Sequence, residues 1–316
     1  MTSGSPVPYP IGMPGMPWSA ADKAAWLGRQ RIQRSYAAEV VTPLEARVPA
    51  QAELFQYGVL DYARFGLATY PLYALRSRTW KPNHPVVVVT GGVHGYETSG
   101  VQGALHWIEH DFDGHAGDVN VLVLPCVSPW GYETINRWNP EALDPNRQFN
   151  PGSLVAESTL AMACVSAHCE RVDLHVDLHE TTDTDNSEFG PAKAARDGVP
   201  FDRHAIPDGF YVVADSQRPA PEFQRALIDA VRRVTHIAEA DENGLIIGAK
   251  LQQAGVIHLD KRQLGLCGGM TDALFVTTTE VYPDSPAASP ALCNEAQVAA
   301  VNAAIRHLLQ SVQASR

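Results

Sequence analysis

Short runs of apolar, β-branched residues recur along the chain, and segments with a helical spacing of apolar positions separate them. Residues 86–90 read VVVVT between Pro85 and Gly91, which is typical of a central strand buried on both faces. The other strands are predicted at 52–62, 69–77, 118–125, 172–179, 209–214 and 275–282. Helices are predicted at 19–36, with Ser19 as the N-cap, and at 98–112, 152–169, 219–238 and 290–310.

This alternation of strands and helices predicts an α/β protein. We expect a single domain, residues 19–316, with a central mixed, mostly parallel twisted sheet of about eight strands and helices on both faces. Residues 1–18 are rich in Pro and Gly and are predicted to form an extended arm. Two segments, 126–150 and 183–208, show no regular spacing and are predicted to be long loops. A loop as long as 126–150 inside a compact domain is usually functional.

The net charge of the chain argues against two classes of binding partner, nucleic acids and membrane surfaces. The 316 residues include 24 Lys and Arg against 35 Asp and Glu, a formal net charge of −11. Nucleic-acid grooves and polybasic membrane surfaces need a positive field, so we expect neither partner. The chain has no apolar run of about 18 residues that would span a bilayer, and its first residues lack the features of a signal peptide. We therefore expect a cytoplasmic protein.

The cysteines carry little functional signal. Five are spread along the chain without a CxxC pair, which favours small core residues over disulfides or zinc ligands.

The first candidate for chemistry directly follows the strand at 86–90. Residues 91–97 read GGVHGYE, and ligands in open α/β sheets bind beyond the carboxyl ends of strands. His94 and Glu97 are three positions apart, and with one distant His they can form a zinc site that leaves a position open for water. A capping carboxylate beside an incidental surface His is the alternative interpretation.

Two later strands also end on polar residues. His179 ends the strand at 172–179 and is the better third ligand, whereas His175 is expected to pack or hydrogen-bond inside the sheet. Two imidazoles and a carboxylate suit one zinc ion per chain, although cobalt or manganese also fit such ligands. Glu280 interrupts the apolar strand at 275–282, either as a partly exposed edge residue or as a general base.

The long segment at 126–150 adds positive charge. Arg137 and Arg147 could bind a carboxylate or stabilise an oxyanion, and Asn146 could orient the same group. Asp144 could accept the free imidazole N–H of a ligand His. Taken singly, each of these residues is better explained as a surface polar group.

Together these motifs resemble the zinc carboxypeptidase family, which includes the carboxypeptidase A-like peptidases. Its close relatives are the succinylglutamate desuccinylases and aspartoacylases. The resemblance rests on GGVHGYE, SPWGY with Arg137, DPNRQF, VDLHE, CGGMTD and TTTEV, which run in this order from Gly91 to Val281. Each motif is modest, but six in register are specific. The resemblance implies a carboxypeptidase-like fold for the predicted domain.

The resemblance also implies the metal chemistry. By position, His94, Glu97 and His179 correspond to the zinc ligands, and Asp144 corresponds to the carboxylate that orients His94. Glu280 corresponds to the general base that takes a proton from water and returns it to the leaving amine. Zinc is thus the expected cofactor.

For the substrate, the resemblance implies that Arg137 polarises the scissile carbonyl and that Asn146 and Arg147 bind a terminal carboxylate. Thr271 corresponds to the base of the side-chain pocket, where Thr supports neither a strictly acidic nor a strictly basic specificity. The pocket tyrosine of these peptidases is absent, since Leu264 stands near its position. Three residues could replace the tyrosine, namely His258, Lys261 and Arg262.

We therefore predict a zinc metallocarboxypeptidase that removes a C-terminal residue from a small peptide. The alternative is an N-acyl amino acid deacylase of the aspartoacylase type, and a minor alternative is a zinc-binding protein without turnover. Both enzyme hypotheses predict a small substrate with a free carboxylate. The oligomeric state has no signal in the sequence.

Overall fold

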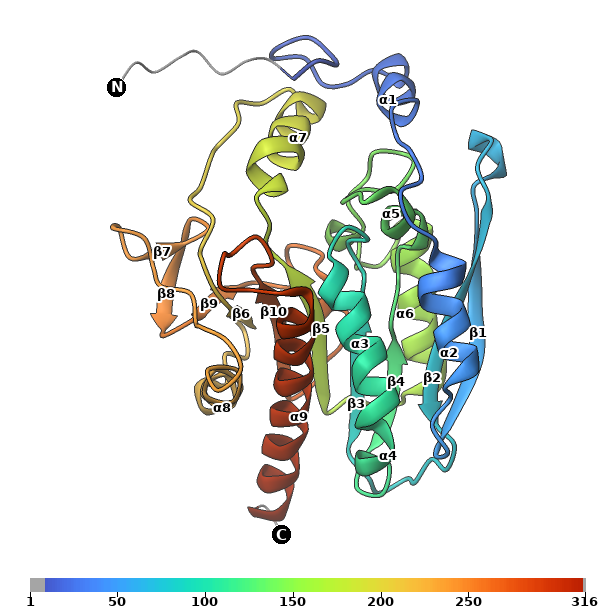
Figure 1. Ribbon diagram of the computed structural model, residues 1–316, viewed down its shortest axis with the longest axis vertical. Helices are drawn as coiled ribbons and strands as arrows, with labels where there is room; N and C mark the ends of the chain where they lie inside the picture. The colour runs from blue at the N-terminus through green and yellow to red at the C-terminus, as the bar shows by residue number, and fades with distance from the viewer. Residues whose placement is uncertain (1–8, 315–316) are drawn as a thin grey trace.

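The computed structural model describes residues 9–314 and contains one ten-stranded sheet in the order β1-β2-β4-β3-β5-β10-β6-β9-β8-β7 (Figure 1). The four strands β4, β3, β5 and β10 are parallel neighbours at its centre, and the flanking strands β2 and β6 are antiparallel to them. The strands are β1 (Ala52–Asp61), β2 (Thr69–Ser77), β3 (Val86–Gly91), β4 (Asn120–Leu124), β5 (Leu174–Glu180), β6 (Tyr211–Asp215), β7 (Leu245–Ile246), β8 (Ala249–Gln253), β9 (Val256–Leu259) and β10 (Phe275–Val281). The predicted α/β sheet is confirmed, with ten strands instead of about eight.

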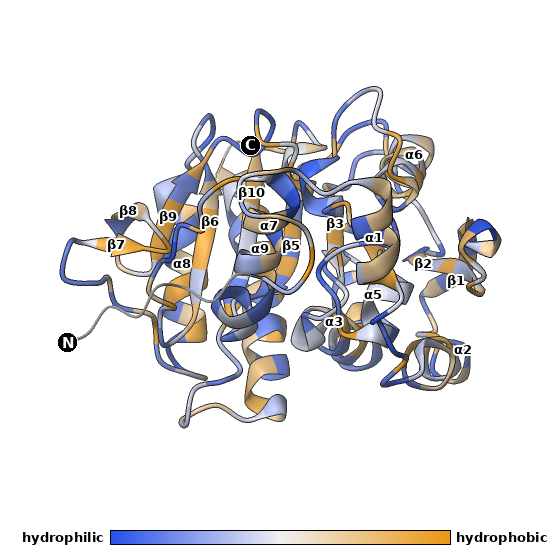
Figure 2. Ribbon diagram, turned by 90° about the horizontal axis from the view of Figure 1, so that it is seen from above, coloured by the Kyte–Doolittle hydropathy of each residue, from blue (hydrophilic) through white to orange (hydrophobic). Residues whose placement is uncertain are grey.

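Helices cover both faces of the sheet. Viewed from above in Figure 2, α3, α8 and α9 lie on one side of the strands and α6 lies on the other. The α-helices are α1 (Ala20–Leu27), α2 (Thr42–Ala46), α3 (Thr98–His110), α4 (Phe112–His115), α5 (Pro129–Thr134), α6 (Ala156–His168), α7 (Gly190–Asp197), α8 (Pro221–Val231) and α9 (Pro290–Ala314). Short 3-10 or π-helical segments are η1 (Ala37–Val41), η2 (Ala63–Phe65), η3 (Pro145–Arg147), η4 (Asp185–Phe189) and η5 (Cys267–Gly269).

The valine run of β3 shows why this strand lies at the centre. Val87 and Val89 pack into the larger apolar core, whereas Val86 and Val88 pack into a second core on the opposite face. Successive side chains of a strand point to opposite faces, so only a strand covered on both sides buries four valines in a row. The sequence prediction for this strand is confirmed.

Several segments differ from the sequence prediction: the strands β7–β9 were not predicted, and the helix expected over 219–238 ends at Val231. The helix expected over 19–36 has its N-cap at Ser19 but ends at Leu27, before Gly28. The segments 126–150 and 183–208 are not plain loops, because they contain α5 and η3, and η4 and α7, respectively. The starts of α5 and α7 each carry a proline, which the helix tolerates in its first turn but which hides the helical pattern in the sequence.

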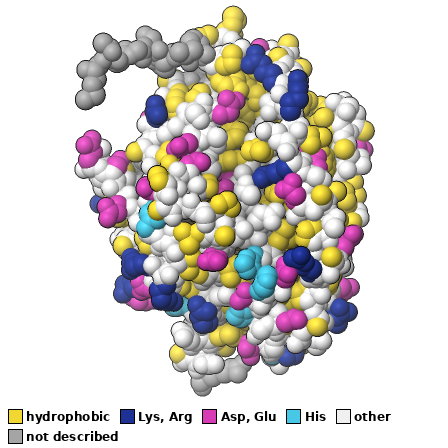
Figure 3. All heavy atoms as spheres, in the orientation of Figure 1, with side chains coloured by type: hydrophobic (Ala, Val, Ile, Leu, Met, Phe, Trp, Pro, Cys, Tyr) yellow, Lys and Arg dark blue, Asp and Glu magenta, His cyan; other side chains and the backbone are white. Residues whose placement is uncertain are grey.

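Other predictions concern the termini and the cysteines. Residues 1–8 of the predicted arm lie outside the described residues, whereas residues 9–18 run along the molecule to Trp18, which is buried. All five cysteines are buried and none is in a disulfide. Among residues 9–314, no helix combines the length and apolar character needed to cross a membrane. On the face drawn in Figure 3, acidic and basic side chains are interspersed.

The sheet fixes the location of the predicted site. Because β3, β5 and β10 are parallel neighbours, their carboxyl ends at Gly91, Glu180 and Val281 meet at one edge of the sheet. Side chains that follow these ends therefore converge, as expected for a ligand site in a sheet of this type.

Candidate metal and substrate site

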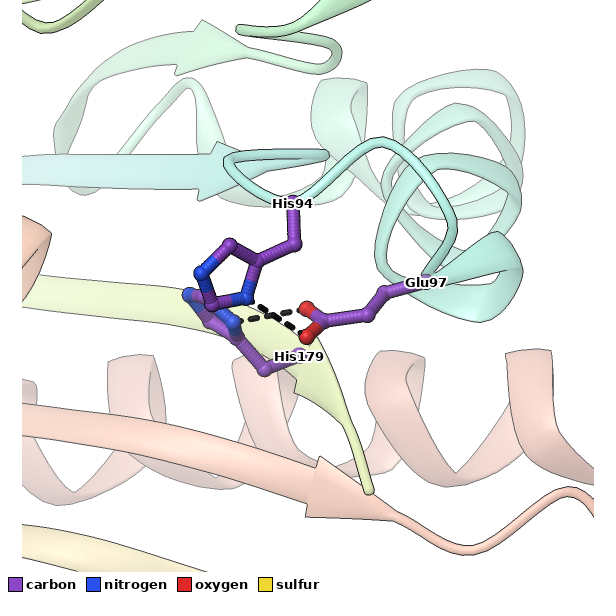
Figure 4. Close-up of side chains that lie close together, drawn as sticks. All are labelled: His94, Glu97 and His179. Atoms are coloured by element: carbon purple, nitrogen blue, oxygen red, sulfur yellow. Dashed lines mark hydrogen bonds and ion pairs between the residues drawn. The ribbon is translucent and has the colours of Figure 1, made fainter. Parts of the chain in front are cut away.

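Three buried side chains converge at this edge (Figure 4). The carboxylate of Glu97 lies between the two imidazoles, with 2.7 Å from Oε1 to Nδ1 of His94 and 2.6 Å from Oε2 to Nδ1 of His179. One ligand atom from each residue lies within 4.8 Å of the others. The three predicted metal ligands are thus brought together from the β3–α3 connection and from β5.

Two glycines allow this connection. Gly92 has a φ of +60°, a left-handed conformation that side chains rarely adopt. Gly95 packs so closely on the chain at Tyr132 that a Cβ there would lie 2.0 Å from the Tyr132 backbone nitrogen. Glycine at these positions lets the chain turn tightly between β3 and α3, and this turn places His94 and Glu97 side by side.

The outer nitrogen of each imidazole meets a second carboxylate. Nε2 of His94 lies 2.9 Å from Oδ1 of Asp144, and Nε2 of His179 lies 2.9 Å from Oδ2 of Asp177. These contacts favour the tautomers with a proton on Nε2, which leave the Nδ1 lone pairs directed at Glu97. Asp144 thus lies against His94, and Asp177 has the same relation to His179.

This donor set fits a divalent cation. Oε2 of Glu97 is buried and accepts no well-aligned hydrogen bond from the described residues, although an imidazole nitrogen lies close to it. Two lone pairs facing a carboxylate repel one another unless a proton or a cation lies between them. Two imidazoles and one carboxylate are a common zinc set that leaves a coordination position open. Burial raises the pKa of Glu97, but in the absence of a metal the positive charges of protonated His179 and His94 outweigh it and lower the value to about 2.

Glu180 connects the segments that carry the three residues. Its carboxylate accepts the backbone N–H groups of Thr98 and Ser99, at 2.9 and 2.6 Å, at the start of α3. The residue after His179 thereby holds the residues after Glu97, so β5 and α3 keep a fixed spacing. Two N–H groups that the helix itself leaves unpaired are also satisfied.

The arginines and the asparagine lie beside this cluster. Arg137 donates to Oδ2 of Asp144 at 3.1 Å, to the Tyr96 hydroxyl at 3.1 Å and to Asp185 at 3.4 Å. Asn146 is buried, and its side-chain oxygen accepts the backbone N–H of Cys267 at 2.7 Å. This contact leaves the amide group of Asn146 as a donor.

Glu280 lies on β10 directly beside His179 of β5. Its carboxylate accepts a hydrogen bond of 2.9 Å from the hydroxyl of Thr181, which also contacts the Tyr211 hydroxyl at 2.7 Å. Burial raises the pKa of Glu280 to about 8, against the opposing charge of His179. A bound divalent cation would lower that pKa.

One cavity of about 290 Å³ joins these groups. Its walls include all but one of the predicted site residues, namely His94, Glu97, Arg137, Asp144, Asn146, Arg147, His179 and Glu280. The exception is Thr271, which is buried away from the cavity with its hydroxyl 3.3 Å from Nδ1 of His175. None of His258, Lys261 and Arg262, the residues considered for the missing tyrosine, lines the cavity.

Sequence reasoning missed the residues that cover the cavity. They come from residues 183–208, here called the covering segment, and include Asp185, Phe189, Lys193, Phe201 and His204. Tyr211 of β6 was missed too, and it places a phenol in the wall. No local sequence pattern predicts that these residues line the cavity, because the covering segment reaches it only through its packing on the rest of the chain.

Comparison with known proteins supports this architecture. Residues 83–201 match the model of the succinylglutamate desuccinylase/aspartoacylase catalytic domain. No curated protein sequence matches the chain.

Solved structures extend the likeness to most of the chain. A candidate metallopeptidase from Shewanella amazonensis is 21% identical with a TM-score of 0.64, over 89% of this chain and 99% of that one. The metallo-carboxypeptidase of Pseudomonas aeruginosa, solved with (2-guanidinoethylmercapto)succinic acid, is 16% identical with a TM-score of 0.55, over 93% and 70%. Carboxypeptidase A of Helicoverpa armigera is 13% identical with a TM-score of 0.54, over 95% and 75%.

At these identities the structural likeness shows the fold alone. The sequence match over residues 83–201 is the separate evidence of similarity to a known catalytic domain. The chain therefore has a carboxypeptidase-like fold, and its residues 83–201 are similar in sequence to the succinylglutamate desuccinylase/aspartoacylase catalytic domain.

Proposed function

We propose that the protein is a zinc-dependent hydrolase that removes the C-terminal residue of a small peptide. The observation that carries this proposal is the convergence of His94, Glu97 and His179 with Glu280 and two arginines around one cavity. Each of these groups has its own role in amide hydrolysis. Metal binding alone, or carboxylate binding alone, would need only some of them.

The roles follow from the chemistry of each side chain. His94, Glu97 and His179 would hold zinc, which supplies a Lewis acid that acidifies water and polarises a carbonyl. Glu280 accepts the proton of the attacking water and returns it to the leaving amine. Arg137 is held by Asp144 and Asp185 and stabilises negative charge on the carbonyl oxygen.

The remaining residues bind the substrate. Arg147 and the amide of Asn146 bind its free carboxylate, which fixes the position of the scissile bond relative to Glu280. The covering segment closes one side of the cavity, and a volume of about 290 Å³ suits a substrate of a few residues better than the end of a folded protein.

A second candidate is an N-acyl amino acid deacylase. The family match over 83–201 favours it, because the matching model describes desuccinylases and aspartoacylases. Both reactions break an amide bond next to a free carboxylate, so the same residues would serve both.

The test compares the zinc-loaded wild type with Glu280→Gln on three substrate groups: short peptides, the same peptides with amidated C-termini, and N-acyl amino acids. We expect cleavage of the free peptides, no cleavage of the amidated ones, and a loss of about 10²–10⁴-fold in Glu280→Gln with zinc retained. Cleavage of N-acyl amino acids alone would select the deacylase. Zinc binding without any turnover would favour a binding protein.

A further inference from the structure

Strand β10 carries polar residues on both of its faces, in addition to the proposed catalytic Glu280. Thr277 and Thr279 of β10 donate hydrogen bonds to Gln224 of α8 and Gln297 of α9 on the helix-covered face. Successive residues alternate, so Thr278 and Glu280 point to the opposite face and toward the cavity. Both line its wall.

Besides Glu280, the wall of the cavity includes Val213, Leu259, Leu266 and Thr278, and we call the part that these four residues line the inner pocket. Thr278 and Val213 are paired on neighbouring strands, and both are buried. The hydroxyl of Thr278 is the one side-chain polar group among these four residues.

A charged residue lies behind this hydroxyl. Lys261 follows Leu259 closely in the chain, its side chain is fully buried, and its Nζ donates a hydrogen bond of 2.5 Å to Oγ1 of Thr278. Leu266 donates its backbone N–H to the carbonyl of Lys261 at 2.9 Å, so the turn that carries Lys261 also builds the wall.

The ammonium of Lys261 is poorly compensated. Asp177, Asp215 and Glu280 act on its charge, but among residues 9–314 none of them forms an ion pair with it, and Thr278 is the hydrogen-bond partner that the described side chains offer it. An ammonium has three donors, and burying a cation without a partner is costly. A fold keeps such a group most readily where it acts on a ligand.

The hydrogen bond also fixes the direction of the Thr278 proton. Since Oγ1 accepts from Lys261, the hydroxyl has its own proton left to donate, and the remaining neighbours in the inner pocket are apolar. A substrate group that reached Thr278 would meet a donor polarised by a buried cation.

We propose that Lys261, acting through Thr278, makes the inner pocket selective for a substrate side chain that ends in an acceptor oxygen, as a carboxylate or a carboxamide does. This inference rests on the proposed function, because Asn146, Arg147 and Glu280 must orient the substrate so that its side chain points inward. Lys261 is a positioning residue, and Thr278 makes the contact. An apolar side chain of equal length would leave the hydroxyl unpaired, a defect that strongly disfavours binding.

The experiment uses zinc-loaded full-length protein and one peptide series that ends in Gln, Glu or Met, which have similar lengths. We expect the wild type to prefer Gln or Glu over Met by about 100-fold in kcat/KM. Lys261→Met and Thr278→Val should each reduce this ratio to within about threefold. Lys250→Met, an exposed lysine on β8, is the matched control and should keep the wild-type ratio.

A merely structural lysine would lower all three activities together and leave the ratio unchanged, and this result would overturn the inference. So would a wild type that prefers Met. If Lys261→Met does not fold, Thr278→Val is compared with Thr278→Ser, which keeps the hydroxyl that pairs with Lys261 and should keep the wild-type ratio.

Binding of the free amino acids Gln, Glu and Met, measured by calorimetry, separates the two proposals. Selective binding that Thr278→Val abolishes, without any peptide cleavage, would refute the proposed function and keep the inference. Cleavage without selectivity would do the reverse. If none of the three binds and no peptide series shows a preference, the inner pocket does not receive the side chain and the inference fails.

Discussion

Asp177 illustrates how much of the site depends on residues that are not among the three proposed metal ligands. It contacts Nε2 of His179 at 2.9 Å, and its other oxygen accepts the hydroxyl proton of Thr90 at 2.6 Å. The hydrogen bond from Thr90 holds the carboxylate of Asp177 in place, and the carboxylate in turn orients the imidazole of His179 and raises its basicity.

Asp177→Asn should therefore weaken zinc binding by about 10–100-fold while the fold persists. Competition with a chromophoric chelator measures the affinity. Asp272→Asn, at an exposed carboxylate outside the cavity, is the control. Equal affinities in the two variants would show that Asp177 has no part in holding the metal.

Lys261 should reduce the stability of the fold. Burial lowers the pKa of its ammonium to about 8. Keeping it charged at pH 7 costs about 3 kcal/mol, and its hydrogen bond to Thr278 restores about 1 kcal/mol. Lys261→Met should then raise the free energy of unfolding by about 2 kcal/mol, measured by urea denaturation at pH 7.

The same gain should depend on pH with a defined sign. Below about pH 8 Lys261 is charged in both the folded and the unfolded state, so the penalty is complete. Between pH 8 and about 10.5 the unfolded state binds more protons, wild-type stability rises, and the advantage of Lys261→Met shrinks. The groups that act on the ammonium by charge are Asp177, Asp215, Glu280 and Cys267, and all are present in both proteins. An advantage that is constant from pH 7 to 10 would contradict this account.

At the scale of the elements, the N-terminal arm supports the covering segment. Trp18 donates its backbone N–H to the carbonyl of Arg196 in α7 at 2.9 Å. The guanidinium of Arg196 stacks on the ring of Trp138 at 4.4 Å, and the Trp18 ring packs edge-on against the same ring. The arm thereby fixes α7, whose Lys193 lines the cavity.

Trp18→Ala should loosen the covering segment without reaching the proposed metal ligands. Removal of a buried indole costs about 3–5 kcal/mol, part of it local to these contacts. We expect faster proteolysis within residues 198–208 and a several-fold rise in KM at normal zinc content. Trp18→Phe keeps a ring in place and should change both quantities less. Faster proteolysis with an unchanged KM would show that the segment has no role in binding.

How far the sequence predicts an element depends on whether its own residues determine it. The valine run of β3 and the TYPLYALRS pattern of β2 specify strands wherever they are buried, and both were predicted nearly to the residue. The strands β7–β9 are two to five residues long and were missed, because so short a stretch carries no clear period.

The same distinction applies to the site. His94, Glu97 and His179 could be named as a set because six motifs in register resemble one family, whereas the spacing of His94 and Glu97 alone also fits a capping carboxylate beside a surface His. Lys261 and Tyr211 could not be assigned correctly, because their importance arises from burial beside residues that are distant in the sequence.

For the whole molecule, the sheet concentrates charge at one edge. Glu97, Asp144 and Asp177 are all buried there, and the two imidazoles share them. A divalent cation would offset this density of carboxylates, so zinc that binds only the folded state should stabilise the entire domain. At a free concentration 1,000 times Kd, that linkage is worth about 4 kcal/mol.

Removal of zinc with a chelator should then lower the Tm by about 5 °C for a chain of this size, as measured by calorimetry. His179→Ala should have a low Tm that the chelator hardly changes, since its site no longer binds zinc. Amide exchange locates the effect: without metal it should accelerate in residues 92–99 and 179–182, whereas β3 and β5 stay protected by their ladders. A chelator effect of equal size in His179→Ala would mean that the stabilising ion binds elsewhere, and a metal role for this edge of the sheet would have to be abandoned.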